Sequence, residues 1–172
     1  MADVNRQILL NAHPVGDLQH SDFKMVESEV PELGEGEALI QTLYLAVEPA
    51  MKGWMENRAD YVDPMAIGDV MRGFGTGRVI ASNNERLPVG SVVSGGLGWQ
   101  EYVVTDGKSV PVQTIPDGVD IPASMGVLGV TGLTAYFGMM EIGKPKEGDT
   151  VLVSGAAGAT GSVAGQLAKF AG

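Results

Sequence analysis

Three glycines near the end of the chain, Gly155, Gly158 and Gly161, have the type and spacing to hold a phosphate group. An apolar run, residues 151–153, precedes them, and a helix-forming run, residues 162–170, follows. In a strand–turn–helix unit, glycines let the backbone approach a pyrophosphate, and the helix N-terminus offers unpaired N–H groups. A glycine-rich turn joining any strand to any helix is the alternative interpretation. The pattern predicts diphosphate contacts of a dinucleotide at Ala157, Gly158, Ala159, Thr160 and Gly161.

The composition excludes several other chemistries. The chain has no cysteine, which rules out disulfides, thiolate zinc sites and cysteine nucleophiles, and its two histidines, His13 and His20, have no metal-ligand spacing. No metal site is therefore predicted. A formal net charge of −10 opposes binding to nucleic acid. No apolar run reaches the roughly 18 residues that cross a bilayer, and no apolar leader opens the chain, so we expect no membrane partner and a cytoplasmic location.

The first part of the chain must supply the scaffold for any such site. Short β-branched and aliphatic runs alternate with Gly, Pro and acidic turns up to Gly107, which predicts a β-rich unit. Irregular spacing of these runs favours a small barrel over a regular sandwich. Residues 51–63 lack a clean period and are predicted as a short helix or loop. The predicted strands are residues 6–10, 37–47, 77–82, 91–94 and 101–105.

The pattern changes near Pro122. Residues 123–140 contain no proline and have helical apolar spacing, although three glycines loosen it. We interpret those glycines as sites of close helix packing. Residues 151–154 are predicted as a buried strand. The sequence thus predicts two domains, residues 1–122 and 123–172.

Several of these segments resemble a known family. Residues 128–137 (LGVTGLTAYF) and 153–163 (VSGAAGATGSV) closely resemble zinc-independent medium-chain dehydrogenase/reductases. Residues 44–55 (YLAVEPAMKGWM) resemble the signature of the leukotriene/prostaglandin reductase and alkenal double-bond reductase branch. The resemblance implies an α/β protein in which a GroES-like β-barrel catalytic domain precedes a Rossmann domain. It covers about half of a typical member, so only the first strand, turn and helix of the Rossmann domain are expected.

The resemblance also implies an activity. Such enzymes use NADPH to reduce the carbon–carbon double bond of α,β-unsaturated ketones or aldehydes, and the full-length protein is expected to be a homodimer. Conjugate reduction needs stabilisation of an enolate oxygen, which hydrogen-bond donors provide without a metal. A quinone oxidoreductase of the same superfamily and a non-catalytic binding module are the alternatives. The residues alone do not choose between NADPH and NADH, and the chain by itself is expected to be inactive.

Three further site residues follow from the resemblance. Tyr44 corresponds to a tyrosine that lines the substrate pocket, and its phenol could donate a hydrogen bond to the enolate oxygen. Met51 and Thr134 correspond to positions near the nicotinamide end of the cofactor. The alternatives are a half-buried strand tyrosine, a core methionine and a threonine bonded within its own helix. The main catalytic residue of the family is expected outside this chain.

Overall fold

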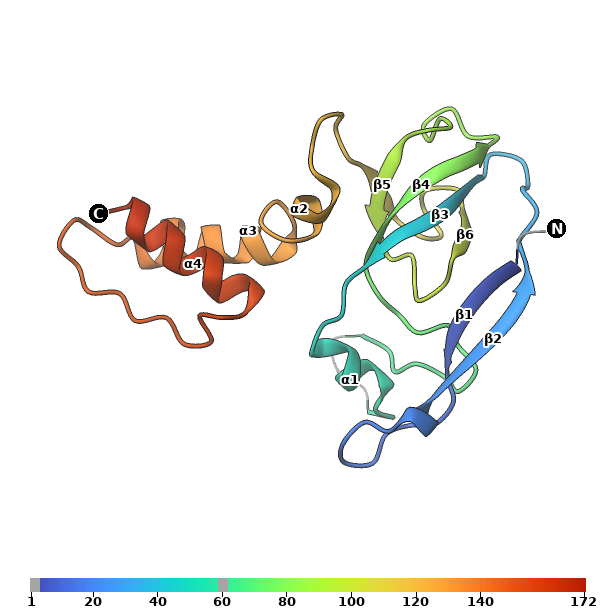
Figure 1. Cartoon of the computed structure of the whole chain (residues 1–172), viewed down its shortest axis with the longest axis horizontal. Coiled ribbons are helices and arrows are strands. Elements are labelled where there is room, and N and C mark those ends of the chain that lie inside the picture. Colours follow the sequence, from blue (N-terminus) through green and yellow to red (C-terminus); the bar gives the residue numbers. More distant parts are fainter. Residues whose placement is uncertain (1–3, 59–61) are drawn as a thin grey trace. The chain divides into compact units, whose positions relative to one another are not determined.

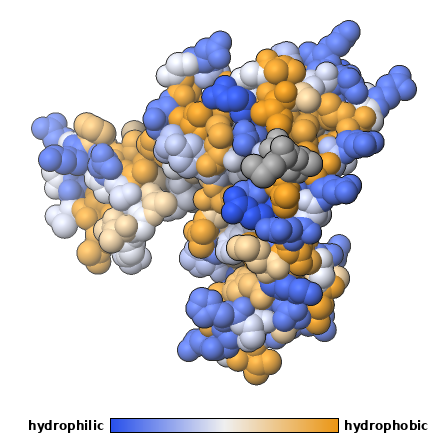
Figure 2. All heavy atoms as spheres, turned by 45° about the vertical axis from the view of Figure 1, so that its right-hand side comes forward, coloured by the Kyte–Doolittle hydropathy of each residue, from blue (hydrophilic) through white to orange (hydrophobic). Residues whose placement is uncertain are grey.

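The computed structural model describes residues 4–58 and 62–172, and the chain divides into two compact units. Unit 1 is Met1–Pro116 and unit 2 is Asp117–Gly172. Unit 1 holds every strand among the described residues, whereas unit 2 is helical. On the face drawn in Figure 2, hydrophobic residues reach the surface beside hydrophilic ones, so the cores of the two units take in only part of the apolar side chains.

Unit 1 begins with an antiparallel hairpin of β1 (Val4–Leu10) and β2 (Phe23–Glu29), which lie side by side in Figure 1. A short 3-10 turn, η1 (His20–Asp22), leads into β2. The sequence predicts β1 from residue 6 but misses β2, because its run FKMVESE alternates too many charged residues with its apolar ones to read as a strand. The backbone N–H of Ile8 donates to the carbonyl of Trp99, which joins the hairpin to the rest of unit 1.

A five-stranded antiparallel sheet forms the larger part of unit 1, in the order β6-β3-β4-β5-β7. The four strands β3 to β6 confirm predicted strands with bounds shifted by one or two residues, and β7 is a three-residue strand that the sequence analysis misses. The strands are β3 (Ala38–Leu45), β4 (Gly75–Ser82), β5 (Val92–Gly95), β6 (Tyr102–Thr105) and β7 (Val112–Thr114).

The predicted barrel does not close among the described residues, because β6 and β7 are not paired with one another. The outer side of β6 instead meets β1 through the buried side chain of Asn5. Its Nδ2 donates to the carbonyl of Tyr102 at 3.0 Å, and its Oδ1 accepts from the backbone N–H groups of Glu101 and Tyr102. The hairpin therefore occupies the edge that barrel closure would need.

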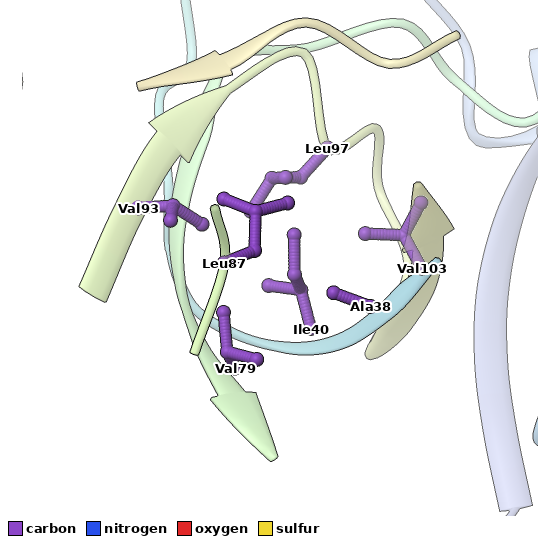
Figure 3. Packing of buried hydrophobic residues seen from close by; sticks show 7 residues of the cluster. All are labelled: Ala38, Ile40, Val79, Leu87, Val93, Leu97 and Val103. Carbon is purple, nitrogen blue, oxygen red and sulfur yellow. The ribbon is translucent and has the colours of Figure 1, made fainter. Parts of the chain in front are cut away.

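Two apolar clusters form the core of unit 1. In the first, side chains from β3, β4, β5 and β6 converge with Leu87 and Leu97 from the loops (Figure 3). The second is rich in methionine and lies around α1 (Ala50–Met55). This helix falls at the start of the segment 51–63, which is predicted as a short helix or loop; residues 59–61 lie outside the described residues. The two clusters hold β3 and α1, which carry the predicted site residues Tyr44 and Met51.

In unit 2 the predicted single helix is divided in two. Helix α2 (Ile121–Met125) ends at Gly126, and α3 (Val130–Tyr136) continues into the π-helical stretch η2 (Phe137–Gly143). A Cβ atom on Gly132 would lie 1.8 Å from the carbonyl oxygen of Val127, so the chain folds tightly back on itself there. Helix α3 packs against α4 (Ala159–Phe170) through small buried residues, as the glycine pattern predicts.

The predicted strand at residues 151–154 is wrong, because this segment is irregular in the structure. A strand obtains its backbone hydrogen bonds from neighbouring strands, and unit 2 contains none among its described residues. The side chain of Leu152 is 96% exposed accordingly.

Candidate functional site

A cavity of about 400 Å³ lies beside Tyr44 in unit 1. Two elements supply most of its wall: the carboxyl end of β3 and the segment that precedes β6. The hairpin β1–β2 supplies the rest, and the walls are mostly apolar. The lining residues are Arg6, Ile8, Met25, Thr42, Leu43, Tyr44, Leu45, Trp99, Gln100 and Glu101.

Local backbone geometry brings consecutive residues of β3 to this cavity. Side chains of a regular strand alternate between its two faces. The register between β3 and β4 shifts between Thr42 and Tyr44, where one extra residue is accommodated. Such an irregularity breaks the alternation, and bulges of this kind re-aim side chains next to functional sites. Tyr44 is 48% exposed, so its phenol is accessible from solvent.

An ion pair forms the charged part of the cavity wall. The guanidinium Nε of Arg6 donates to Oε2 of Glu101 at 3.0 Å, and the backbone N–H of Arg6 donates to the same oxygen at 3.1 Å. These hydrogen bonds lower the pKa of the Glu101 carboxyl and raise that of Arg6. The carboxylate is therefore engaged and charged, and it is poorly suited to act as a general base at neutral pH.

Two buried polar atoms on the cavity's residues have no hydrogen-bond partner among the described residues. They are Oγ1 of Thr42 and Nε1 of Trp99. The indole of Trp99 stacks on Phe23, with ring centroids 6.0 Å apart, and its Nε1 edge faces Gly73, where a Cβ atom would come within 2.9 Å. Trp99 is thus fixed on both sides, while the Thr42 hydroxyl lies on the strand that carries Tyr44.

Met51 lies in the methionine-rich cluster rather than in the cavity. It is 5% exposed and packs with Trp54, Met55 and other apolar side chains of the cluster. Its methyl group lies near Gly73: a Cβ atom built on Gly73 would be 3.2 Å from the Cε atom of Met51. The structure therefore places Tyr44 and Met51 in the same unit, Tyr44 at the cavity and Met51 in the methionine-rich cluster, and Trp99 contacts both the cavity and the cluster.

Thr134 lies on the exposed face of α3, in unit 2. Its hydroxyl donates to the carbonyl of Val130 at 2.7 Å, one helical turn earlier. This is the bond within the helix that the sequence analysis names as the alternative to a cofactor contact.

The glycine turn has the features of a phosphate cradle. Gly155 has a φ of +60°, and a Cβ atom on Gly161 would lie 2.4 Å from the Gly155 carbonyl oxygen. Gly158 is the N-cap of α4 and offers no side chain to the N–H groups of the first helical turn. Those N–H groups belong to Ala159, Thr160 and Gly161, and Ala157 precedes them in the exposed turn. A dinucleotide diphosphate fits this donor set, because its oxygens accept from backbone N–H groups at a helix N-terminus.

Comparison with known proteins identifies the family of the chain. Residues 6–112 match the family model described as the N-terminal domain of oxidoreductase. The chain belongs to this family. Family members similar to it include the NADPH-dependent curcumin reductase of Escherichia coli (strain K12), 38% identical over 98% of the chain and 48% of that protein. Prostaglandin reductase 1 of Bos taurus is 38% identical over 95% of the chain and 48% of its own length.

A solved structure shows the same relationship. CurA from Vibrio vulnificus, crystallised in complex with NADPH, is 38% identical and superimposes with a TM-score of 0.88 over 97% of the chain and 49% of CurA. The chain thus contains a GroES-like N-terminal domain of the medium-chain superfamily, in the branch of prostaglandin, curcumin and 2-alkenal reductases. It spans about half the length of each of these relatives.

Sequence reasoning missed part of the cavity. Thr42 and the Arg6–Glu101 pair carry no motif, and Arg6 and Glu101 are 95 residues apart in sequence. The pairing of β3 with β6, which gives this neighbourhood, follows from tertiary structure. Among the described residues no three His, Asp or Glu side chains are grouped to hold a metal ion, and no helix is long and apolar enough to cross a membrane.

Proposed function

We propose that the chain forms the substrate-binding part, and the beginning of the nucleotide-binding part, of an NADPH-dependent reductase of α,β-unsaturated ketones and aldehydes. The observation that supports this most strongly is the likeness to the NADPH complex of CurA, which extends through the glycine turn and not only through the family domain. The relatives include curcumin, prostaglandin and 2-alkenal reductases, and a 2-alkenal is an α,β-unsaturated aldehyde.

The turn before α4 is the proposed diphosphate site. The backbone N–H groups of Ala159, Thr160 and Gly161 would donate to the diphosphate oxygens, and the small residues Ala157 and Gly158 would leave room for them. When bound, NADPH supplies the hydride. Met51 and Thr134 remain proposed contacts of its nicotinamide end, although their observed packing and hydrogen bond require a local rearrangement for such contact.

The cavity beside Tyr44 is the proposed substrate site. Its apolar walls would exclude water from the hydrocarbon part of an enone, and the exposed phenol of Tyr44 would donate a hydrogen bond to the carbonyl oxygen. This bond strengthens as negative charge develops on the oxygen in the enolate, so it favours the transition state over the ground state.

A chimera tests the proposal. Residues 1–172 are joined to the unmatched second half of E. coli curcumin reductase, and oxidation of NADPH is followed with an enone and with a quinone. We expect turnover with the enone, and a loss of about 100-fold in kcat for Tyr44→Phe, the range found on removing one oxyanion donor. Faster turnover of the quinone would favour the quinone oxidoreductase alternative.

Two glycine variants of the same chimera test the cradle. In Gly161→Ala the new methyl group would collide with the Gly155 carbonyl, whereas nothing lies within 4 Å of a Cβ atom at Gly165. Gly161→Ala should therefore raise the KM for NADPH at least tenfold, and Gly165→Ala should leave it unchanged. Equal KM values for the two variants would contradict the assignment of the cradle.

A further inference from the structure

We infer that the ligand bound in the cavity beside Tyr44 accepts a second hydrogen bond, from the hydroxyl of Thr42, on its carbonyl oxygen. We also infer that unit 1 binds this ligand when no nucleotide is present. The ligand class is an unsaturated ketone with an apolar chain. This inference rests on the proposed function, since it names a further residue and a property of the same cavity.

The hydroxyl of Thr42 lacks a partner that its burial demands. Oγ1 has no hydrogen-bond partner among the described residues, although the backbone N–H of Thr42 is satisfied by the Glu101 carbonyl at 2.8 Å. A buried hydroxyl without a hydrogen-bond partner destabilises the folded state, so such groups are rare in native proteins and call for an explanation. A ligand oxygen in the cavity that Thr42 lines supplies the missing partner after rotation about χ1, a fast side-chain motion.

The geometry of β3 brings the residues Thr42 and Tyr44 to the same cavity. Both residues line the cavity, and the register shift lies between them. Two hydroxyl donors matter because a carbonyl oxygen has two lone pairs and can accept two hydrogen bonds. Leu43 and Leu45 are apolar, so Thr42 and Tyr44 are the two hydroxyl-bearing residues that β3 contributes to the cavity.

The cavity is complete within unit 1. Every lining residue lies between Arg6 and Glu101, and none belongs to unit 2 or to the glycine turn. Its volume of about 400 Å³ falls within the range of about 300–1,000 Å³ found for small-molecule sites. Ligand binding should therefore need neither nucleotide nor the remainder of a full-length reductase.

Fluorescence of the 172-residue chain measures this binding directly. The chain has two tryptophans, and Trp99 lines the cavity whereas Trp54 lies in the methionine-rich cluster. In a Trp54→Phe background, Trp99 becomes the sole indole reporter, and 3-nonen-2-one added without nucleotide should produce a saturable signal. The absence of cysteine removes the thiol that would add covalently to the enone, and recovery of the signal on dilution confirms reversible binding. Equilibrium dialysis of the unmutated chain repeats the measurement without the Trp54 substitution.

The substitution Thr42→Val separates the effect of the hydrogen bond from that of packing, because valine has nearly the same shape as threonine but lacks the hydroxyl. It should weaken binding of the enone about 3- to 10-fold, which corresponds to one neutral hydrogen bond, and leave binding of the matching hydrocarbon unchanged. Thr114→Val, at an exposed position on β7, is the matched control and should change neither affinity.

Two results would overturn the inference: no saturable binding by either method, or equal enone affinities for Thr42→Val and the parent chain. Neither result bears on hydride transfer, which the chimera measures with nucleotide present. An inactive chimera beside an intact Thr42 effect would overturn the proposed function alone.

Discussion

The two units of this chain differ in the size of the apolar residues that they bury. Unit 1 buries large side chains such as Ile40, Met55 and Leu97 in two clusters. In unit 2 the buried residues are small, namely Gly132, Ala135 and Ala164, and large apolar side chains lie on the surface. These exposed residues are Val127, Leu128, Val130, Leu133, Tyr136, Phe137, Ile142, Val151, Leu152 and Phe170. Because apolar burial provides most of the free energy of folding, unit 1 has the means to fold by itself and unit 2 does not.

Hydrogen exchange gives the largest expected contrast. Amides of β3 and β4, in the centre of the sheet, should exchange only through global unfolding, with protection equivalent to about 5–15 kcal/mol. Amides of α3 and α4 should exchange with protection close to zero, because little apolar area holds these helices in place. Mass spectrometry of peptides from each unit measures both. Strong protection of α4 in a monomer would contradict the comparison; protection that appears only at high concentration would show that unit 2 associates with other copies.

A matched pair of isoleucines tests the same contrast with single substitutions. Ile40 on β3 is fully buried in the first apolar cluster, whereas Ile142 in η2 is 82% exposed. Ile40→Ala should lower the free energy of unfolding by about 2–5 kcal/mol, because it removes apolar contacts and leaves a cavity. Ile142→Ala should change it by no more than about 0.5 kcal/mol. Urea unfolding followed by circular dichroism gives both values, and comparable losses would mean that unit 2 has a core of its own.

Asn5 is expected to contribute less than Ile40, but more than a surface residue, to the free energy of unfolding. Its amide satisfies two N–H groups and one carbonyl of the segment leading into β6. Asn5→Ala should cost about 1–3 kcal/mol, because these backbone groups lose their partners in a buried place. Asn11→Ala is the control, since the amide of Asn11 makes an exposed bond to the Ser21 carbonyl. Equal urea midpoints for the two variants would show that the hairpin is held to the sheet by other contacts.

Sequence reasoning succeeded where a segment's own pattern decides its structure. The strands β3, β4, β5 and β6 have local β-branched and aliphatic runs with turn residues at their ends, and α4 contains the predicted helical segment 162–170. Helix α1 lies in a segment predicted as a short helix or loop. Sequence reasoning failed where the structure of a segment depends on whether a neighbouring strand is available to pair with it. The run at residues 151–154 has strand composition but no neighbouring strand in unit 2, and β2 becomes a strand because β1 pairs with it.

The same distinction between local pattern and tertiary contact applies to the residues of the candidate site. The close approach of Gly161 to Gly155 is seen in the structure and depends on residues that are near in sequence, whereas phosphate binding at this turn stays a prediction. Tyr44 was named from a resemblance, whereas Thr42 was not, since its significance depends on an unpaired hydroxyl and a register shift that no sequence pattern reports.

The smallest expected effect concerns Asp106, in the loop after β6. Its carboxylate accepts hydrogen bonds from the backbone N–H groups of Lys108 and Ser109 and from the Ser109 hydroxyl, which together lower its pKa from 3.8 to about 2. A carboxyl group whose pKa is lower in the folded state stabilises that state above the unfolded pKa, and this contribution disappears as the pH falls from about 4 to about 2. Ser109→Ala should raise the pKa of Asp106 by removing one of the three donors and should narrow that pH interval. Carboxyl chemical shifts followed by NMR across the acid range measure the pKa directly. An unchanged pKa of Asp106 in Ser109→Ala would assign the shift to the two backbone donors. A pKa of Asp106 near 3.8 in the parent chain would mean that these hydrogen bonds are not kept in solution, and that this loop of unit 1 is as weakly ordered as the segments of unit 2.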